Sequence, residues 1–258
     1  MEMDSLFDLT GKVAVVTGGG DGIGKGCCEI LAAAGASVVV SDLSLEKASD
    51  VAHSINEAGG KAVAIDCNVS RKDDLERLIS FAVESYGTIN ILVNNAGRGG
   101  AGREDPYNID LEYVENIYAI NVFAPWQLCK LAAPYMKESG YGSIINITSM
   151  SSVNKSPAIA IYASSKAALN HLAANLAFDY GKMGIRINNV GPGATRTHAL
   201  STVLTPEIEE RMLAHTPLKR LGEVSDIAGA VLYFASPISA WVSGQVLMVN
   251  GGGVQTLD

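Results

Sequence analysis

The amino-acid sequence predicts a single α/β domain in which a doubly wound parallel sheet carries helices on both faces. The main observation is that short β-branched segments alternate with longer segments of helical apolar periodicity, from residues 12–17 to residues 246–249. No internal repeat, charge run or low-complexity linker divides the 258 residues, which have the length of one domain. Hydrophobic residues make up 48% and charged residues only 18%, which favours a compact globule over a disordered chain.

Charge and cysteine content argue against several kinds of site. The net charge of −8 and the lack of a basic patch argue against nucleic acid as a partner, because phosphates are neutralised by clustered Lys and Arg. The cysteines at positions 27, 28, 67 and 129 have no C-x-x-C spacing and no His cluster nearby, so we expect buried thiols in a reducing cytoplasm and no metal. The acidic N-terminus and the lack of long apolar windows predict neither secretion nor a membrane span.

The first strand and helix have the features of a phosphate-binding turn. Residues 12–17 are a β-branched run that ends in a glycine-rich loop, and a periodic segment follows at residues 23–34. Glycines allow close approach of the backbone, and the N–H groups at a helix start face an anion. The spacing Gly18-x-x-x-Gly22-x-Gly24 differs from the G-x-G-x-x-G fingerprint of long-chain dinucleotide enzymes. A plain turn is the alternative, but the flanking strand and helix favour nucleotide binding.

Asp42 follows the second predicted strand, residues 37–40, and favours NAD over NADP. An acidic side chain there is placed to accept hydrogen bonds from the adenosine ribose hydroxyls and to repel a 2′-phosphate. The glycine loop contains no Lys or Arg that would bind such a phosphate, and Asp21 adds negative charge. The alternative is that Asp42 or Ser44 is simply the N-cap of the helix expected at residues 45–58.

The alternation continues with a strand at residues 62–69, a helix at 71–86 and a strand at 89–93. The last of these runs into Asn94-Asn95-Ala96-Gly97, where small residues let the backbone pass beside a flat cofactor. Asn side chains can satisfy the buried polar groups of such a turn.

A glycine-rich patch at residues 98–103, expected to be mobile, precedes a long helix that carries Asn121. An Asn within a helix is ordinarily a satisfied core amide or an exposed residue. Its functional interpretation therefore depends on where that helix packs.

The candidate catalytic groups lie between Ser149 and Lys166. Ser149 follows a buried strand expected at residues 144–148, and ligands of open α/β sheets bind at the carboxyl ends of strands. Tyr162 and Lys166 are four residues apart in a helical segment that continues to about residue 180, so they share one face. A phenol ordinarily titrates near ~10, and a nearby ammonium favours the phenolate and lowers that pKa. Taken alone, the pair is more commonly an aromatic beside a solvated lysine.

The C-terminal part of the chain completes the sheet and adds an interruption. A strand at residues 184–190 ends in a loop at 191–197 that contains Pro192-Gly193. An acidic, amphipathic segment at residues 205–215 then breaks the strand–helix rhythm, as a lid over a substrate pocket does. The final helix is expected at residues 225–235, before the last strand.

Together these residues resemble the classical short-chain dehydrogenase/reductase family, from residue 12 to about residue 252. The resemblance implies one Rossmann-type domain, residues 1–258, with seven parallel strands in the order 3-2-1-4-5-6-7, a substrate lid at about residues 195–218, and a homotetramer. The motifs that carry it are Thr17-Gly18-x-x-x-Gly22-x-Gly24, Asn94-Asn95-Ala96-Gly97, Asn121, Ser149, Tyr162-x-x-x-Lys166 and Pro192-Gly193.

The resemblance also implies roles for individual residues. Tyr162 would be the general acid/base and Ser149 would hydrogen-bond the reacting oxygen, so both would bind substrate. Lys166 would lower the pKa of Tyr162 and hold the nicotinamide ribose, and Asn121 would fix a water that links Lys166 to solvent. Asn68 departs from the family pattern, which more often has Asp beside the adenine. The implied NAD contacts are Gly18, Asp21, Ile23, Asp42, Asn68, Val69, Asn95, Tyr162, Lys166, Pro192, Thr195 and Thr197.

Within the family, the C-terminal half resembles bacterial hydroxysteroid dehydrogenases that oxidise the 7α-hydroxyl of bile acids to a ketone. The resemblance includes residues 205–209, 215–217 and 251–255. Arg98 and Arg196 depart from that pattern and leave the position of the hydroxyl open. Apolar lid residues that suit a steroid, with core packing as the alternative, are Leu200, Val203, Leu204, Met212 and Leu213.

Two other functions remain open. The same enzyme class includes dehydrogenases of other secondary alcohols, sugar alcohols or 3-oxoacyl thioesters, although a thioester enzyme would usually use NADPH, which Asp42 disfavours. The second open function is that of a non-catalytic nucleotide-sensing protein with the same fold, since fold alone does not define function. The complete set Asn121, Ser149, Tyr162 and Lys166 argues against it.

Overall fold

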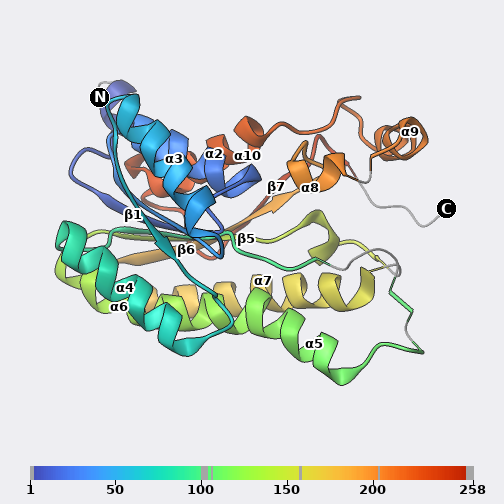
Figure 1. Ribbon diagram of the computed structural model, residues 1–258, viewed down its shortest axis with the longest axis horizontal. Helices are drawn as coiled ribbons and strands as arrows, with labels where there is room; N and C mark the ends of the chain where they lie inside the picture. Colours follow the sequence, from blue (N-terminus) through green and yellow to red (C-terminus); the bar gives the residue numbers. More distant parts are fainter. Residues whose placement is uncertain (1–2, 100–103, 106, 157–158, 203, 254–258) are drawn as a thin grey trace.

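A computed structural model describes residues 3–99, 104–105, 107–156, 159–202 and 204–253. Its centre is one parallel sheet of seven strands in the order β3-β2-β1-β4-β5-β6-β7, which confirms the predicted topology (Figure 1). The strands are β1 (Val13–Thr17), β2 (Ser37–Asp42), β3 (Lys61–Asp66), β4 (Ile91–Asn94), β5 (Gly142–Ile147), β6 (Ile185–Pro192) and β7 (Val246–Val249).

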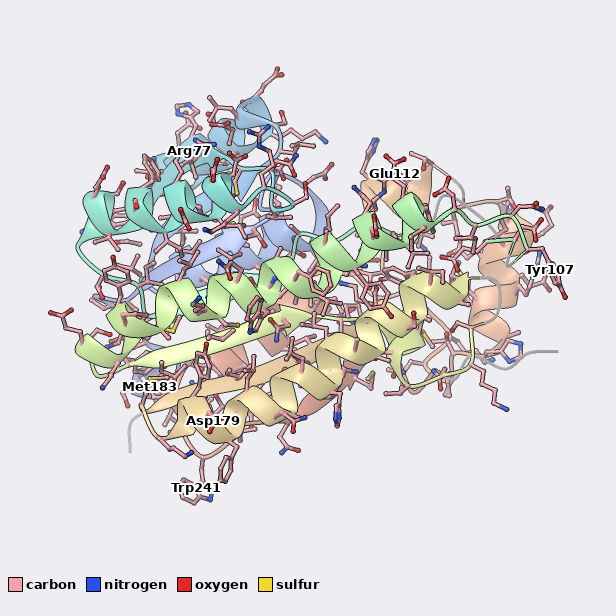
Figure 2. The ribbon with its side chains drawn as sticks, turned by 90° about the horizontal axis from the view of Figure 1, so that it is seen from below. Arg77, Tyr107, Glu112, Asp179, Met183 and Trp241 are labelled. Atoms are coloured by element: carbon pink, nitrogen blue, oxygen red, sulfur yellow. The ribbon has the colours of Figure 1, made fainter. Side chains whose placement is uncertain are left out.

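Helices cover both faces of the sheet (Figure 1). α2, α3 and α10 lie on one face, and α4, α5, α6 and α7 lie on the other, where Figure 2 views them directly. The helical segments are α1 (Met3–Phe7), α2 (Gly22–Ala33), α3 (Leu45–Glu57), α4 (Lys72–Tyr86), α5 (Leu111–Tyr118), η1 (Ala119–Phe123), α6 (Ala124–Glu138), η2 (Met150–Ser152), α7 (Ala160–Gly181), α8 (His198–Ser201), α9 (Pro206–Ala214), α10 (Val224–Ala235) and η4 (Pro237–Ser239). Among the helices of the described residues, none is long and apolar enough to cross a membrane.

The central strands are buried on both sides, which explains their continuous apolar runs. Along β1, Ala14 and Val16 belong to the core beneath α2 and α10, whereas Val15 belongs to the core beneath α4 and α6. Successive side chains of a strand point to opposite faces, so a strand between two helical layers needs apolar residues at every position. The two cores fix the sheet, and with it the strand ends that carry the candidate site.

The strand predicted at residues 62–69 ends earlier, at Asp66. The reason is local turn chemistry: the Asn68 side-chain oxygen accepts hydrogen bonds from the backbone N and the hydroxyl of Ser70, and the Asn68 carbonyl accepts from the Arg71 N. An Asn that bonds its own backbone two residues on favours a turn over a strand.

The long helix predicted to carry Asn121 is interrupted. Residues Ala119–Phe123 form a π-helical turn between α5 and α6, in which the Ala124 N donates to the Ala119 carbonyl. Pro125 explains the interruption, because it has no N–H to donate to the Asn121 carbonyl and its ring would clash with that carbonyl in a regular helix. The wider turn leaves the Asn121 side chain fully buried. Of the patch at residues 98–103, residues 100–103 lie outside the described part, as does Val203 of the lid.

Candidate active site

A cleft of about 610 Å³ runs along the carboxyl ends of the strands. The strand-end residues that line it include Asp42 at the end of β2, Asn95 after β4 and Ser149 after β5. Open parallel sheets bind ligands at this edge. The cleft is also lined by every residue predicted to contact NAD, namely Gly18, Asp21, Ile23, Asp42, Asn68, Val69, Asn95, Tyr162, Lys166, Pro192, Thr195 and Thr197.

The glycine loop at one side of the cleft is too tightly packed for larger residues. Gly18 has a φ of +62°, and a Cβ built on Gly24 would lie 1.9 Å from the Gly18 carbonyl oxygen. Asn95 braces the same loop, since its side-chain nitrogen donates to the carbonyls of Thr17 and Gly18 at 2.9 Å each. Asp21 caps α2 through the Gly22 N. The loop therefore presents backbone and the start of α2 to the cleft, which suits a phosphate group.

Asp42 holds the glycine loop and does not cap the next helix. Its carboxylate accepts from the Gly20 N and the Ser44 N at 3.0 Å each, while Ser44 is the N-cap of α3. Lys47 of α3 reaches back to Asp21 at 3.1 Å, and this contact lowers the pKa of the Asp21 carboxyl. Sequence spacing did not reveal Lys47. Because Asp21 neutralises Lys47, the negative charge at the end of the second strand is that of the Asp42 carboxylate.

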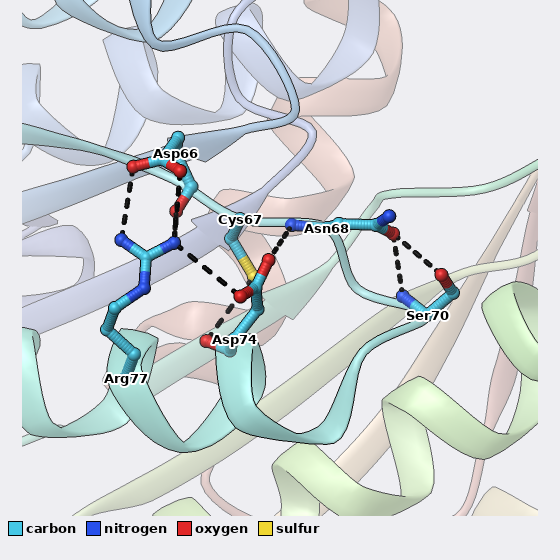
Figure 3. Close-up of polar contacts among 6 residues, drawn as sticks. All are labelled: Asp66, Cys67, Asn68, Ser70, Asp74 and Arg77. Atoms are coloured by element: carbon cyan, nitrogen blue, oxygen red, sulfur yellow. Dashed lines mark hydrogen bonds and ion pairs between the residues drawn. The ribbon is translucent and has the colours of Figure 1, made fainter.

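Asn68 follows the end of β3, beside the end of β2 that carries Asp42, and belongs to a polar network (Figure 3). Its backbone N donates to the Asp74 carboxylate at 2.8 Å, and Arg77 pairs with both oxygens of Asp66 at 3.1 Å. The Ser70 N can only donate, so it fixes the Asn68 side-chain oxygen on its own side. The amide nitrogen of Asn68 is then the atom that can reach a ligand in the cleft.

Ser149 and Tyr162 meet inside the cleft, although they come from different elements. Ser149 is the residue before η2, and its hydroxyl oxygen accepts from the Ser151 N at 3.1 Å and the Ser151 hydroxyl at 2.9 Å. Tyr162 lies in the first turn of α7. Burial raises the pKa of the Tyr162 phenol above its usual value, and a hydrogen bond with Ser149 acts in the opposite direction.

Lys166 lies one helical turn further along α7, and its side chain is buried with 4% exposed. Its ammonium donates to the Ile147 carbonyl at 2.9 Å and lies 5.9 Å from the centre of the Tyr162 ring. Burial lowers the pKa of Lys166 to about 8. Burial of the phenol has the largest effect on the Tyr162 pKa, and the predicted lowering of that pKa by Lys166 stays a prediction.

Asn121 does not line the cleft but braces its wall. Its side-chain oxygen accepts from the Arg98 N at 2.8 Å, and its nitrogen donates to the Arg98 carbonyl at 2.9 Å and to the Ser165 hydroxyl at 3.0 Å. These contacts join the loop after β4 to α7. The predicted water held by Asn121 stays a prediction.

Of the apolar lid residues that were expected to suit a steroid, the four that the structure describes do not line the cleft. Leu200, Leu204, Met212 and Leu213 are half-buried, so they are neither core residues nor part of the cleft wall. Arg196 forms ion pairs with Glu209 of α9 at 2.7 Å and with Glu223 at 3.4 Å. It therefore ties the loop after β6 to α9 and to the start of α10.

Several cleft residues were not predicted. Ile147 supplies the carbonyl that holds Lys166, and its apolar side chain gave no sign of this use. His198, at the start of α8, lines the same cleft as Asp21. His198 and Asp21 are 177 residues apart in the sequence, so only the fold brings them together.

Comparisons with known proteins agree with this arrangement across the whole chain. The family model described as enoyl-(acyl carrier protein) reductase matches residues 18–253. A 7alpha-hydroxysteroid dehydrogenase of Escherichia coli K12 is 48% identical over 250 residues, 97% of each chain. One from Clostridium sardiniense is 37% identical over 245 residues, 95% of this chain and 94% of that protein. A solved structure of a 7 alpha-hydroxysteroid dehydrogenase complexed with NADH and 7-oxo glycochenodeoxycholic acid has a TM-score of 0.95 and 46% identity, with 100% of both chains covered.

Proposed function

The chain belongs to the short-chain dehydrogenase/reductase family, and on this premise we propose that it is an NAD-dependent 7α-hydroxysteroid dehydrogenase that oxidises bile acids to 7-ketones. The observation that carries the proposal is the convergence of Ser149, Tyr162 and Lys166 in one cleft of a chain that is similar over its full length to such enzymes. Similarity of fold alone would not support a substrate.

The cleft suits NAD on the chemistry of its own residues. The glycine loop and the start of α2 offer N–H groups to a pyrophosphate. The Asp42 carboxylate offers an acceptor to a ribose diol and would repel a 2′-phosphate. The amide of Asn68 offers a hydrogen-bond donor to a base.

Tyr162 and Ser149 have different roles at the substrate oxygen. NAD, when bound, supplies the acceptor for the hydride of the alcohol carbon. Tyr162, as phenolate, accepts the hydroxyl proton, so the C–H and O–H bonds break and a C=O bond forms; reduction is the reverse. Ser149 holds the oxygen, and the positive charge of Lys166 favours the phenolate.

A panel of bile acids tests the proposal. Purified protein is mixed with cholate, chenodeoxycholate, ursodeoxycholate or deoxycholate, each with NAD and with NADP, and NADH or NADPH formation is followed by absorbance. Turnover of the two 7α-hydroxy acids cholate and chenodeoxycholate, with NAD preferred, is the expected result. Deoxycholate lacks a 7-hydroxyl and ursodeoxycholate carries it in the β configuration, so equal activity on either contradicts the 7α assignment. A preference for NADP contradicts the role of Asp42.

We also propose that α8 and α9 form the substrate lid and that the protein is a cytoplasmic homotetramer. The Arg196–Glu209 ion pair supports the lid, because it joins α9 to a loop that lines the cleft. Exposed aromatic residues support assembly: Phe178 and Trp241 are large apolar side chains in solvent, and Figure 2 shows Trp241 pointing away from the ribbon. Four buried free thiols suit a reducing compartment.

A further inference from the structure

Within the described residues, the helix that carries Tyr162 begins without a capping side chain from its N-cap residue or its first turn. The first four N–H groups of a helix have no partner within the helix and need acceptors from elsewhere. Ile159, the residue before α7, makes no side-chain capping bond, and the first turn of α7 contains no acidic residue. Among the described residues, six other α-helices begin with a capping side chain from the residue before them or from their own first turn, for example Ser44 at α3 and Asp110 at α5. The start of α7 therefore depends on groups from outside.

Glu104 supplies those groups from a loop 57 residues earlier in the chain. One carboxylate oxygen accepts from the Ile161 N at 2.7 Å, and the other accepts from the Tyr162 N at 3.3 Å. The Glu104 side chain is buried, with only 8% of the residue exposed. A carboxylate that is withdrawn from water is stabilised when it accepts N–H bonds at the positive end of a helix.

Tyr113 of α5 holds the same carboxylate from the other side. Its hydroxyl donates to Glu104 at 3.2 Å, and the N-cap of α5, Asp110, accepts from the Tyr113 backbone N at 2.7 Å. α5 and α7 lie side by side in both views (Figures 1 and 2) and are in direct contact. Glu104 therefore links two helices at the point where the chain enters the catalytic turn.

We propose that Glu104 is a positioning residue for Tyr162: its buried carboxylate, held by Tyr113, caps α7 and fixes the backbone of the proposed acid/base. Glu104 itself does not line the cleft, so it acts only through Tyr162. The inference rests on the proposed function of Tyr162. Small displacements of a reacting group lower the rate steeply, whereas binding of a cofactor that contacts many other residues is affected little.

Glu104→Gln tests the proposal, because the amide keeps the size of the side chain but presents an N–H group where the Tyr162 N needs an acceptor. We expect kcat for chenodeoxycholate to fall about tenfold, with the Kd for NAD, measured by calorimetry, within about twofold of wild type. Amide hydrogen exchange, read by mass spectrometry on a peptide that covers Ile161 and Tyr162, is expected to become about tenfold faster. Asp105→Asn is the matched control, because among the described residues the Asp105 carboxylate binds within its own loop, to the Tyr107 N and Asn108. It should leave all three values unchanged.

The outcomes separate the two proposals. Faster exchange with unchanged kcat shows a structural cap and overturns the positioning role, while the proposed function stands. Unchanged exchange overturns the capping itself. A wild type that oxidises no bile acid contradicts the proposed function, but the exchange experiment still reports whether Glu104 holds the Tyr162 turn.

If Glu104→Gln does not fold, Tyr113→Phe removes one hydrogen bond to the same carboxylate and is expected to lower kcat about threefold; an unchanged kcat there overturns the proposal.

Discussion

Replacement of Tyr162 by Phe is expected to lower kcat by about 10³-fold or more while NAD binding stays within about twofold of wild type. The substitution removes only the hydroxyl, so the ring and its packing in the first turn of α7 remain. Without that hydroxyl the substrate proton has no acceptor, because Ser149 lacks a comparable basicity and the Lys166 ammonium has no lone pair. Steady-state rates with chenodeoxycholate and calorimetry with NAD measure the two quantities.

Tyr118→Phe is the matched control for this substitution. The Tyr118 hydroxyl donates at 3.0 Å to the hydroxyl of Ser164, which lies on α7 with Tyr162. Tyr118 does not line the cleft. It should keep kcat within about twofold of wild type. Residual turnover above about a tenth in Tyr162→Phe would exclude Tyr162 as the acid/base.

Lys166→Met is expected to abolish measurable turnover and to make the protein more stable. Burial lowers the pKa of Lys166 from 10.5 to about 8, which corresponds to a cost of about 3 kcal/mol for a charged lysine in the folded state. Met has a similar length and no charge, but it leaves the Ile147 carbonyl without a donor, which offsets about 1–2 kcal/mol. The expected net gain in the free energy of unfolding near neutral pH is about 1–2 kcal/mol.

The gain should shrink as pH rises. Below a pH of about 8, Lys166 is protonated in both the folded and the unfolded protein, so the wild type bears the full cost. Between about 8 and 10.5 the folded protein releases the proton first and the unfolded chain binds more protons, so the stability of the wild type increases. Urea unfolding of both proteins near neutral pH and at about pH 9.5 measures the difference.

Lys72→Met is the control, since Lys72 is 71% exposed and pairs only with Glu76 at the surface. Its effect on the free energy of unfolding should stay below about 0.5 kcal/mol at both pH values. A Lys166→Met protein that is less stable than wild type near neutral pH would mean that the lysine contributes to folding as well as to catalysis.

Local signals in the sequence were enough for the strands and for most of the helices, whereas the full set of cleft residues came with the family resemblance. The strand at residues 246–249 and the N-cap alternative Ser44 follow from short-range patterns of apolar, turn and capping residues. The placement of Tyr162 and Lys166 one turn apart on α7 follows from their four-residue spacing. The order of the strands came with the family resemblance, because alternation alone predicts a parallel sheet without ordering it.

The features that were missed depend on contacts between distant residues or on burial. Glu104 reaches Tyr162 and Lys47 reaches Asp21 only because the fold brings their elements together, and no spacing encodes either contact. The pKa of Tyr162 was predicted to fall because Lys166 was close, whereas burial of the phenol, which raises that pKa, was not predicted. The π-helical turn at Asn121 was within reach of the sequence, since Pro125 disfavours a regular helix over the preceding turn.

The measurement that tests the central claim most directly is the identity of the product formed from chenodeoxycholate and NAD. This substrate carries both a 3α- and a 7α-hydroxyl, so one reaction compares the two positions within a single molecule. Carbon NMR of the isolated product is expected to show a ketone at C7 with the 3-hydroxyl intact, in an amount equal to the NADH formed. A ketone at C3, or NADH formation without a steroid ketone, would contradict the proposed function.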